Sequence, residues 1–163
     1  MLTAERLREV LSYDPISGVF RWRIYSGGKR KAGEEAGGPD GRGYIAIWVD
    51  RKPFKAHRLA WLYMTGHWPA EEIDHRDLRR DNNAWTNLRE ATRRDNRHNQ
   101  PRPKNNRSGF KGVCWNKTVR RWQASITNNG RTQYLGCFLT AIEAHAAYVK
   151  AAHGLYGEFA RTA

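Results

Sequence analysis

The sequence predicts an α+β protein made of two small modules. Its 163 residues suffice for two modest cores. A helical pattern at 2–11 precedes strand-like alternation at 19–25 and 44–49, and three short strand patterns from Phe110 onward precede a helical stretch at 140–154. Between them, the segment after residue 96 is rich in Arg, Lys, Asn and Pro and almost free of apolar residues. We therefore expect a first module at 1–99, an extended basic linker at 100–107 and, at 108–163, a three-stranded antiparallel sheet packed on one helix.

Basic residues outnumber acidic residues along the whole chain. Lys and Arg total 29 against 16 Asp and Glu, a formal net charge of +13. This excess predicts a polyanionic partner. Because no apolar run approaches ~20 residues and no signal-peptide pattern is present, we expect nucleic acid rather than a membrane, and a cytoplasmic location. A high basic charge alone would also suit a ribosomal or histone-like protein. The choice between an enzyme and a packaging protein therefore depends on the sequence motifs.

The two cysteines, Cys114 and Cys137, stand far apart and form no CxxC pair. We expect buried, reduced thiols and no structural zinc site.

Two features of the first module concern its core and its cations. Residues 56–66 form a helical pattern that ends at Gly66, a favoured C-cap residue. In the strand pattern at 19–25, apolar residues alternate with Arg21 and Arg23, and a glycine-rich loop with Lys29-Arg30-Lys31 follows. We expect these cations to contact phosphates.

Residues 71–99 contain an ordered set of Asp, His and Asn residues, namely Asp74-His75, Asn82-Asn83, Asn87-Leu88 and Asn96. This set resembles the HNH nuclease motif, which has Asp-His at the end of a strand, Asn-Asn in a loop, Asn-Leu on the return strand and Asn or His on the following helix. The resemblance implies a ββα-metal module that hydrolyses the phosphodiester bonds of double-stranded DNA.

Hydrolysis of a phosphodiester needs an activated water and an electrophile that neutralises the charge on the phosphate and the departing oxygen. The sequence offers candidate residues for both. His75, as a neutral imidazole, can take a proton from water as the general base. Asp74 and Asn96 offer hard oxygen ligands to one Mg²⁺ or Mn²⁺ ion. The resemblance gives Asn87 the role of bracing the loop and orienting the histidine. Neighbours on a strand point to opposite faces, so Asp74 and His75 share a site only if the backbone bends there.

Two further expectations concern the helix and His57. Thr92 and Asp95 resemble a capping box, so a helix starting at Thr92 places Asn96 and Asn99 on one face, which favours Asn96 over His98 as the ligand. His57 lies in an HRL sequence before the core helix, and we expect it to be structural.

Residues 108–159 resemble the AP2 DNA-binding domain of plant ethylene-response factors. The resemblance rests on Gly109-Phe110-Lys111-Gly112-Val113, Trp122, Ala124, Ile126, Leu135-Gly136, Phe138, Thr140, Glu143-Ala144, Ala147-Tyr148 and Ala151-Ala152. Alternation in the second strand sends its polar set outward, toward a DNA major groove. The expected DNA-facing residues are Lys111, Trp115, Arg121, Gln123, Ser125, Thr127, Thr132 and Tyr134. Plant arginines are replaced here by Cys114, Ser125 and Thr127, so the plant target sequence is not transferable.

The linker carries Arg102, Lys104 and Arg107, which we expect to follow the DNA backbone. The whole pattern predicts a metal-dependent DNA endonuclease of the homing or mobile-element type, phage-encoded, acting as a monomer in a bacterial cytoplasm. One site per chain favours nicking, while a dimer or two successive nicks would give double-strand breaks. The alternatives are a non-catalytic phage DNA-binding regulator and an RNA-binding or ribosome-associated basic protein.

Overall fold

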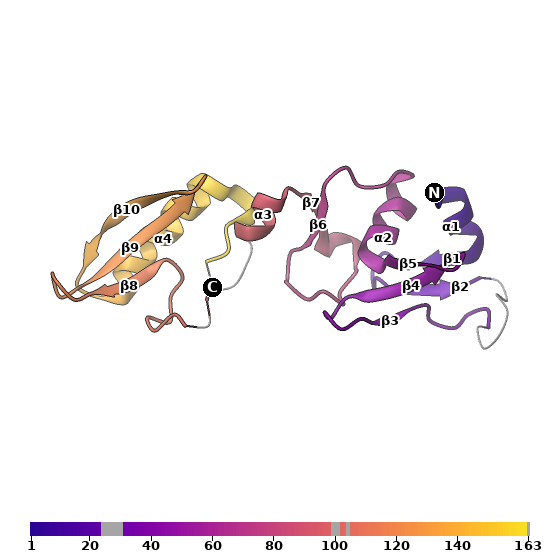
Figure 1. The fold of residues 1–163 in the computed structure, drawn as a ribbon, viewed down its shortest axis with the longest axis horizontal. Coiled ribbons are helices and arrows are strands. Elements are labelled where there is room, and N and C mark those ends of the chain that lie inside the picture. The colour runs from indigo at the N-terminus through magenta and orange to yellow at the C-terminus, as the bar shows by residue number, and fades with distance from the viewer. Residues whose placement is uncertain (24–30, 99–101, 104, 163) are drawn as a thin grey trace. The chain divides into compact units, whose positions relative to one another are not determined.

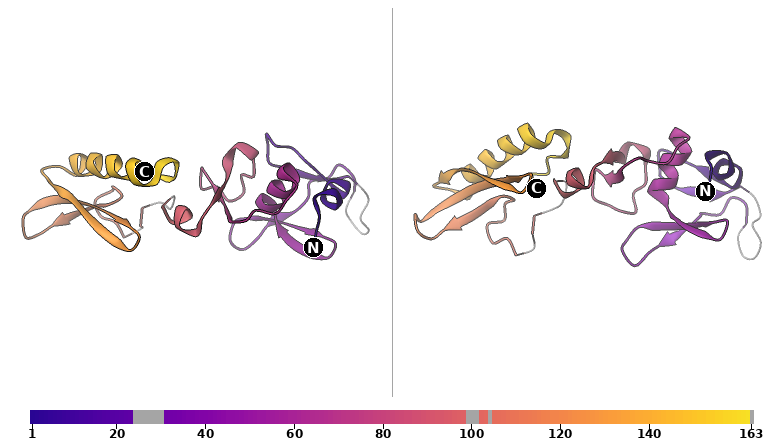
Figure 2. Two further views of the ribbon diagram at one scale, coloured as in Figure 1. Left: turned by 90° about the horizontal axis from the view of Figure 1, so that it is seen from above. Right: turned by 45° about the horizontal axis from the view of Figure 1, so that its top comes forward.

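A computed structural model describes residues 1–23, 31–98, 102, 103 and 105–162. The chain divides into two compact units, Met1–Arg93 and Arg94–Ala163, each of which can be followed in Figures 1 and 2. Of the residues singled out above, Lys29, Arg30, Asn99 and Lys104 lie outside the described residues.

The first unit begins with helix α1 (Ala4–Val10), which lies within the helical pattern predicted at 2–11 and is capped by Thr3. The Thr3 side chain accepts a hydrogen bond from the Arg6 backbone N–H at 3.2 Å. Strands β1 (Leu11–Tyr13) and β2 (Phe20–Trp22) form an antiparallel pair. A second sheet follows, in the order β3 (Gly38–Pro39), β4 (Ile45–Val49) and β5 (Lys52–Lys55).

Helix α2 (Ala56–Thr65) supplies the centre of the first core. Leu59 and Leu62 are buried, and the helix ends at Gly66 in the left-handed conformation, with φ 83°. The apolar residues of α1, β1, β2 and β4 join the same core. This packing fixes the elements that carry the motif residues.

The motif residues lie on strand β6 (Glu72–His75), the short 3-10 turn η1 (Trp85–Asn87), strand β7 (Leu88–Ala91) and helix α3 (Arg93–His98), and in the loop that follows β6. Strand β6 pairs antiparallel with β7, the turn η1 enters β7, and α3 follows. In chain order this is the predicted ββα arrangement, with the helix starting one residue after Thr92.

The second unit is the predicted three-stranded antiparallel sheet on one helix. The sheet order is β10 (Arg131–Phe138), β9 (Arg121–Asn128), β8 (Val113–Asn116), and helix α4 (Ala141–Tyr156) packs on it, followed by the 3-10 turn η2 (Gly157–Phe159). The left view of Figure 2 shows α4 covering one face of the sheet. Thr140 and Glu143 form a reciprocal capping box at its start. The core residues from both layers are Val113, Ala124, Ile126, Ala144, Tyr148 and Ala152.

Two expectations differ from the structure. The described end of the linker turns rather than extends, because Asn106 N–H donates to Pro103 O at 3.0 Å and the Asn106 side chain accepts from Ser108 N–H at 2.9 Å. Cys114 is exposed and Cys137 half-buried, so the prediction of buried thiols was wrong. Both cysteines lie on the open face of the sheet, away from α4.

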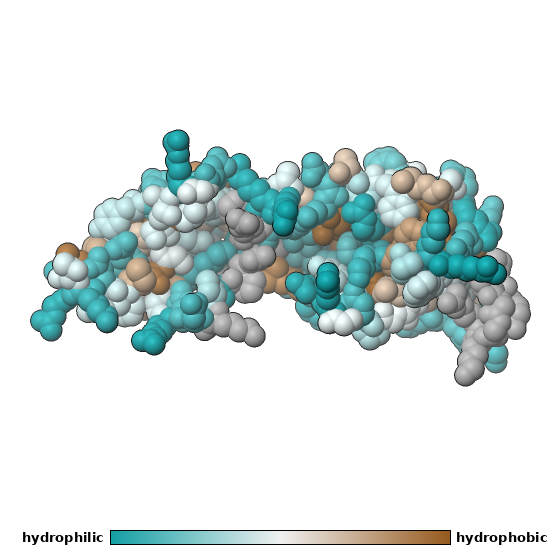
Figure 3. Space-filling model, viewed as in Figure 1, coloured by the Kyte–Doolittle hydropathy of each residue, from teal (hydrophilic) through white to brown (hydrophobic). Residues whose placement is uncertain are grey.

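Polar side chains cover most of the surface seen in Figure 3. Within the described ranges, no helix combines the length and apolar character that a membrane span requires.

Gly18 provides a test of how the first unit supports the motif loop. It has φ +75°, and a Cβ there would lie 2.3 Å from Ala84 N and from the Asn83 carbonyl carbon. Gly18→Ala should lower the free energy of unfolding by about 3 kcal/mol, because a left-handed backbone strain adds to a backbone clash.

Gly66→Ala is the matched control, since Gly66 has φ +83° and a Cβ added there would meet no atom within 4 Å. Its free energy of unfolding should fall by only about 1 kcal/mol. Urea denaturation measures both, and equal losses would show that the contact with the loop does not matter.

Candidate active site

His75 is the last residue of β6 and is buried, with 5% of its surface exposed. The ring of His57, from α2, meets it edge to face at a centroid distance of 5.0 Å. The Tyr44 ring lies 6.0 Å from His75. Three elements far apart in the sequence therefore enclose this imidazole.

The Asn83 amide orients the His75 ring. Its Nδ2 donates to Asp81 O at 3.1 Å, which leaves its Oδ1 toward His75 Nε2 at 3.3 Å. An acceptor there favours the tautomer with the proton on Nε2 and the lone pair on Nδ1. Burial is the main cause that lowers the pKa of His75, so the ring is neutral at physiological pH.

Asn87 ties together the two ends of the loop between β6 and β7. Its Nδ2 donates to Asp77 Oδ1 at 2.9 Å and to Asn82 O at 2.8 Å, and its Oδ1 accepts from Asp77 N–H at 3.0 Å. Asn82 Nδ2 donates to the other Asp77 oxygen at 2.7 Å. These bonds support the bracing role that the motif resemblance implies, with Asp77 as the common acceptor.

Asp74 faces the opposite way from His75. It lies directly across from Arg89 in the β6–β7 register, and its Oδ2 accepts from Arg89 Nε at 3.0 Å and Nη2 at 2.8 Å. Both side chains are buried. Neighbouring residues of a strand alternate between its two faces, so the joint action of Asp74 and His75 in one site stays a prediction.

The donor chemistry around Asp74 fits a hard divalent cation. A carboxylate can ligate through one oxygen while a neighbour holds the other, and such outer partners are usual at metal sites. Asn96, the second predicted ligand, lies in α3 within the second unit, so its approach to Asp74 stays a prediction. Among the residues that the structure describes, no three His, Cys, Asp or Glu side chains converge as a metal cluster.

His57 is buried, with 8% of its surface exposed, and within the described structure its Nδ1 has no hydrogen-bond partner. Burial, with the neighbouring His75 as the next cause, lowers the pKa of His57 to about 3. The sequence predicts a structural histidine here. The contact between its ring and His75 depends on the tertiary fold, so the sequence alone did not predict it.

Cations gather around Tyr44 beside the two histidines. Lys55 Nζ lies 5.3 Å and the Arg80 guanidinium carbon 5.0 Å from the centre of the Tyr44 ring. Lys55 also pairs with Asp40, and Arg80 Nη1 donates to Arg42 O at 2.9 Å. Arg80 and Lys55 are thus cations near the site that the motif did not reveal.

The predicted phosphate contacts of β2 already have intramolecular partners. Arg21 pairs with Glu35 at 2.9 Å, and Arg23 Nη1 donates to Arg8 O at 3.0 Å. Both arginines are exposed, so contact with a phosphate stays a prediction for each.

The strand register of the second unit assigns its open face. The residues pointing away from α4 are Arg121, Gln123, Ser125, Thr127, Thr132 and Tyr134, as the sequence predicts. Trp115 is different, because it pairs across from Trp122 on the inner side, with ring centroids 5.2 Å apart. The prediction that Trp115 lines the open face was wrong, since Trp115 shares the parity of the core residue Val113.

Three other predicted contacts lie outside the sheet itself. Lys111 precedes β8 and is half-buried, and burial lowers its pKa to about 8, with Arg161 as the second cause. Arg102 and Arg107 are exposed.

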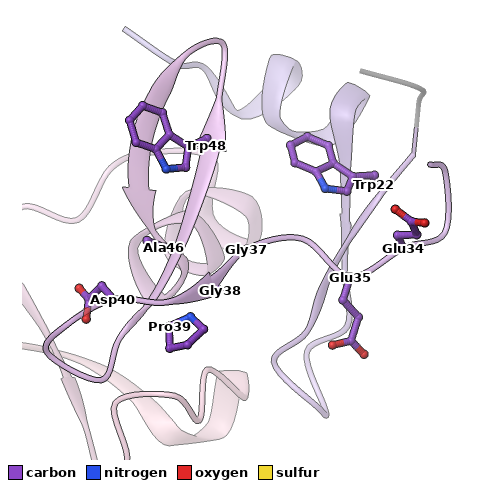
Figure 4. Close-up of a pocket in the computed structure, with 9 residues that line it drawn as sticks. All are labelled: Trp22, Glu34, Glu35, Gly37, Gly38, Pro39, Asp40, Ala46 and Trp48. Atoms are coloured by element: carbon purple, nitrogen blue, oxygen red, sulfur yellow. The ribbon is translucent and has the colours of Figure 1, made fainter. Parts of the chain in front are cut away.

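A separate pocket lies against β3 and β4 (Figure 4). Its lining includes two tryptophans and three carboxylates, namely Trp22, Trp48, Glu34, Glu35 and Asp40. Glu35 pairs with Arg21 and Asp40 with Lys55. The pocket excludes His75 and has no feature that would attract a phosphate.

Comparisons with known proteins decide the family. The model of the HNH endonuclease family matches residues 54–98. Protein 3.8 of Escherichia phage T7 is 33% identical over 108 residues, which is 66% of this chain and 88% of that protein. The chain belongs to the HNH endonuclease family.

Two further similarities cover smaller shares. Dehydration-responsive element-binding protein 2A of Oryza sativa, in both subspecies indica and japonica, is 43% identical over 61 residues, 36% of this chain and 22% of that protein. A solved structure described as "DNA binding and cleavage by the HNH homing endonuclease I-HmuI" is 28% identical with a TM-score of 0.43, covering 55% of this chain. This HNH chain spans 51% of that solved chain.

The buried pair of this HNH module gives a stability prediction. Arg89→Met should lower the free energy of unfolding by about 3–5 kcal/mol, because the Asp74 carboxylate loses its counter-charge inside the protein. Adding Asp74→Leu should recover most of the loss. Denaturant titration measures the double-mutant cycle.

Arg21→Met is the matched control, because its ion pair with Glu35 leaves the two side chains 50% and 65% exposed. It should change the free energy by less than about 1 kcal/mol. A similar effect at both arginines would contradict the assignment of a buried pair.

Because His57 is buried in its neutral form, the free energy of unfolding should depend on pH. The pKa of His57 is about 3 in the folded chain and 6.5 ordinarily, so the unfolded state binds the proton first. The stabilisation is complete above pH 6.5 and is lost as pH falls from 6.5 toward 3, at up to about 1.4 kcal/mol per pH unit.

His57→Phe should flatten this slope, whereas the same change at the exposed His67 should leave it as it is. Thermal denaturation between about pH 4 and 8 measures it. An unchanged slope in His57→Phe would contradict the neutral, buried assignment.

Proposed function

We propose that this chain is a divalent-metal-dependent endonuclease that hydrolyses a phosphodiester bond of double-stranded DNA. The observation that carries the proposal is the His75 imidazole, buried, neutral and oriented by Asn83 at the end of β6. An imidazole of this kind suits a general base at physiological pH. The family membership supplies the reaction class.

The residues divide the reaction as follows. His75 Nδ1 takes a proton from the attacking water while Asn83 Oδ1 holds the Nε2–H. Oxygen attack on phosphorus expels the 3′-oxygen of the neighbouring nucleotide. Asp74 and Asn96 would hold a Mg²⁺ or Mn²⁺ ion, whose chemistry there is to neutralise charge on the phosphate and the leaving oxygen.

Two positioning roles complete the site. Asn87 keeps the β6–β7 loop closed through Asp77, so that Asn83 stays beside His75. Arg89 holds one oxygen of Asp74 and thereby fixes the direction of its carboxylate. Lys55 and Arg80, which lie beside Tyr44, are assigned to contact the DNA phosphates.

Duplex binding is assigned to the second unit. Its open sheet face carries Arg121, Gln123, Ser125, Thr127, Thr132 and Tyr134, and Arg102 and Arg107 add exposed cations. The likeness to an element-binding plant protein supports this assignment. The phage T7 relative supports phage origin. We further propose a homing or mobile-element role and action as a monomer in the bacterial cytoplasm.

A non-catalytic DNA-binding regulator is the second candidate. Such a regulator would bind DNA through the open sheet face and would not hydrolyse it. The intact Asn87 brace and the neutral His75 favour the enzyme.

The test is cleavage of supercoiled plasmid with Mg²⁺ or Mn²⁺. His75→Ala should slow cleavage by about 10²–10⁴-fold at equal DNA occupancy, because the general base is lost. His67→Ala, an exposed histidine of the same unit, is the control and should cut like the wild type.

Binding without cleavage by the wild type, across Mg²⁺, Mn²⁺ and other divalent ions, would replace the endonuclease proposal with the regulator. Equal cleavage by wild type and His75→Ala would instead remove His75 from the base role. Nicked and linear products, resolved on a gel, report the number of strands cut.

A further inference from the structure

The open face of the second unit carries few cations for a DNA-facing sheet. One row across the three strands is Cys114, Gln123 and Cys137. The next rows along β9 and β10 pair Ser125 with Tyr134 and Thr127 with Thr132. Among the described strand residues, the arginine on this face is Arg121, at the start of β9. The middle of the face therefore offers neutral hydrogen-bonding groups.

Gln123, at the centre of this face, has a fixed amide. Asn116 Oδ1 accepts from Thr118 N–H at 3.0 Å and from Val119 N–H at 3.3 Å, so the turn after β8 sets the Asn116 amide. Asn116 Nδ2 then donates to Gln123 Oε1 at 2.9 Å. A reversed Gln123 amide would bring two donors together, so the bond selects one orientation.

In that orientation Gln123 keeps the two hydrogens of Nε2 and a second lone pair on Oε1. An acceptor and a donor side by side match the N6 amino group and N7 of adenine in the major groove. Guanine offers two acceptors there, O6 and N7, and needs two donors from one side chain, as arginine supplies. The fixed amide has only one donor group.

The neighbouring rows suit the same base pair. Thr127 Oγ1 and Thr132 Oγ1 lie 3.0 Å apart and bond each other. One hydroxyl donates to the other, and the threonine methyl groups offer apolar contacts of the kind that read the thymine methyl group.

We propose that Gln123 reads an adenine and that Asn116 positions it, so that the second unit prefers duplexes with an A·T pair at this point. The inference rests on the proposed duplex binding and names a determinant of its target.

The experiment selects binding sites from a randomised duplex library, using the full chain with His75→Ala so that bound DNA stays intact. The selected sites should share an A·T pair at one position, preferred by about tenfold. Gln123→Ala should lose that preference, so that its selected sites no longer share a base pair at this position. Asn116→Ala should weaken the preference, because the amide then rotates.

Gln133→Ala is the matched control, since Gln133 lies across from the core residue Ile126 on the opposite side of β10. It should leave the selected sites unchanged. Gln123→Glu should move the preference to a G·C pair, because a carboxylate accepts from the cytosine amino group.

The outcomes separate the two proposals. Absence of duplex binding by the folded wild type, even at low salt, would overturn duplex binding and this inference together. This inference alone would be overturned if the protein binds duplex DNA but Gln123→Ala leaves the selected sites unchanged. A G·C pair at the position that depends on Gln123 would also overturn it.

Discussion

The hydrogen bonds between Asn87 and Asp77 are the constraint on which the candidate site depends. The loop between β6 and β7 contains many polar and charged residues that could not hold one shape by apolar burial. Asn87, buried at the entrance to β7, bonds both backbone and side chain across the loop. Asn83 is thereby kept beside His75, and Gly18 and Tyr13 support the same segment from the core side. The Asn87 amide thus closes the loop, and the Asn83 amide that the loop carries orients the His75 ring.

Strand alternation separates the two functions of the Asp-His pair. His75 lies among the rings of His57 and Tyr44, where burial keeps it neutral. Asp74 lies on the other side of β6 as a buried anion, and Arg89 supplies its counter-charge. The two residues proposed as base and metal ligand thus occupy environments of different electrostatic character, although they are adjacent in sequence.

Periodicity predicted α1, α2, α4 and the open face of β9, because apolar spacing alone determines which side of each element is buried. Trp115 was misplaced because its face depends on the β8–β9 register, which sets it across from Trp122. The Arg89 partner of Asp74 depends in the same way on how the β6–β7 loop aligns two strands. The contact of His57 with His75 joins residues from separate elements through packing of α2, which no local pattern encodes.

The β6–β7 loop is expected to hold His75 as a neutral imidazole with its proton on Nε2. Long-range ¹H–¹⁵N correlation of the histidine rings at neutral pH measures this protonation state, with the His75 signals assigned by their loss in His75→Gln. We expect a neutral ring protonated on Nε2 in the wild type, and a mixture of tautomers in Asn87→Ala. A protonated imidazolium, or a proton on Nδ1 in the wild type, would contradict it.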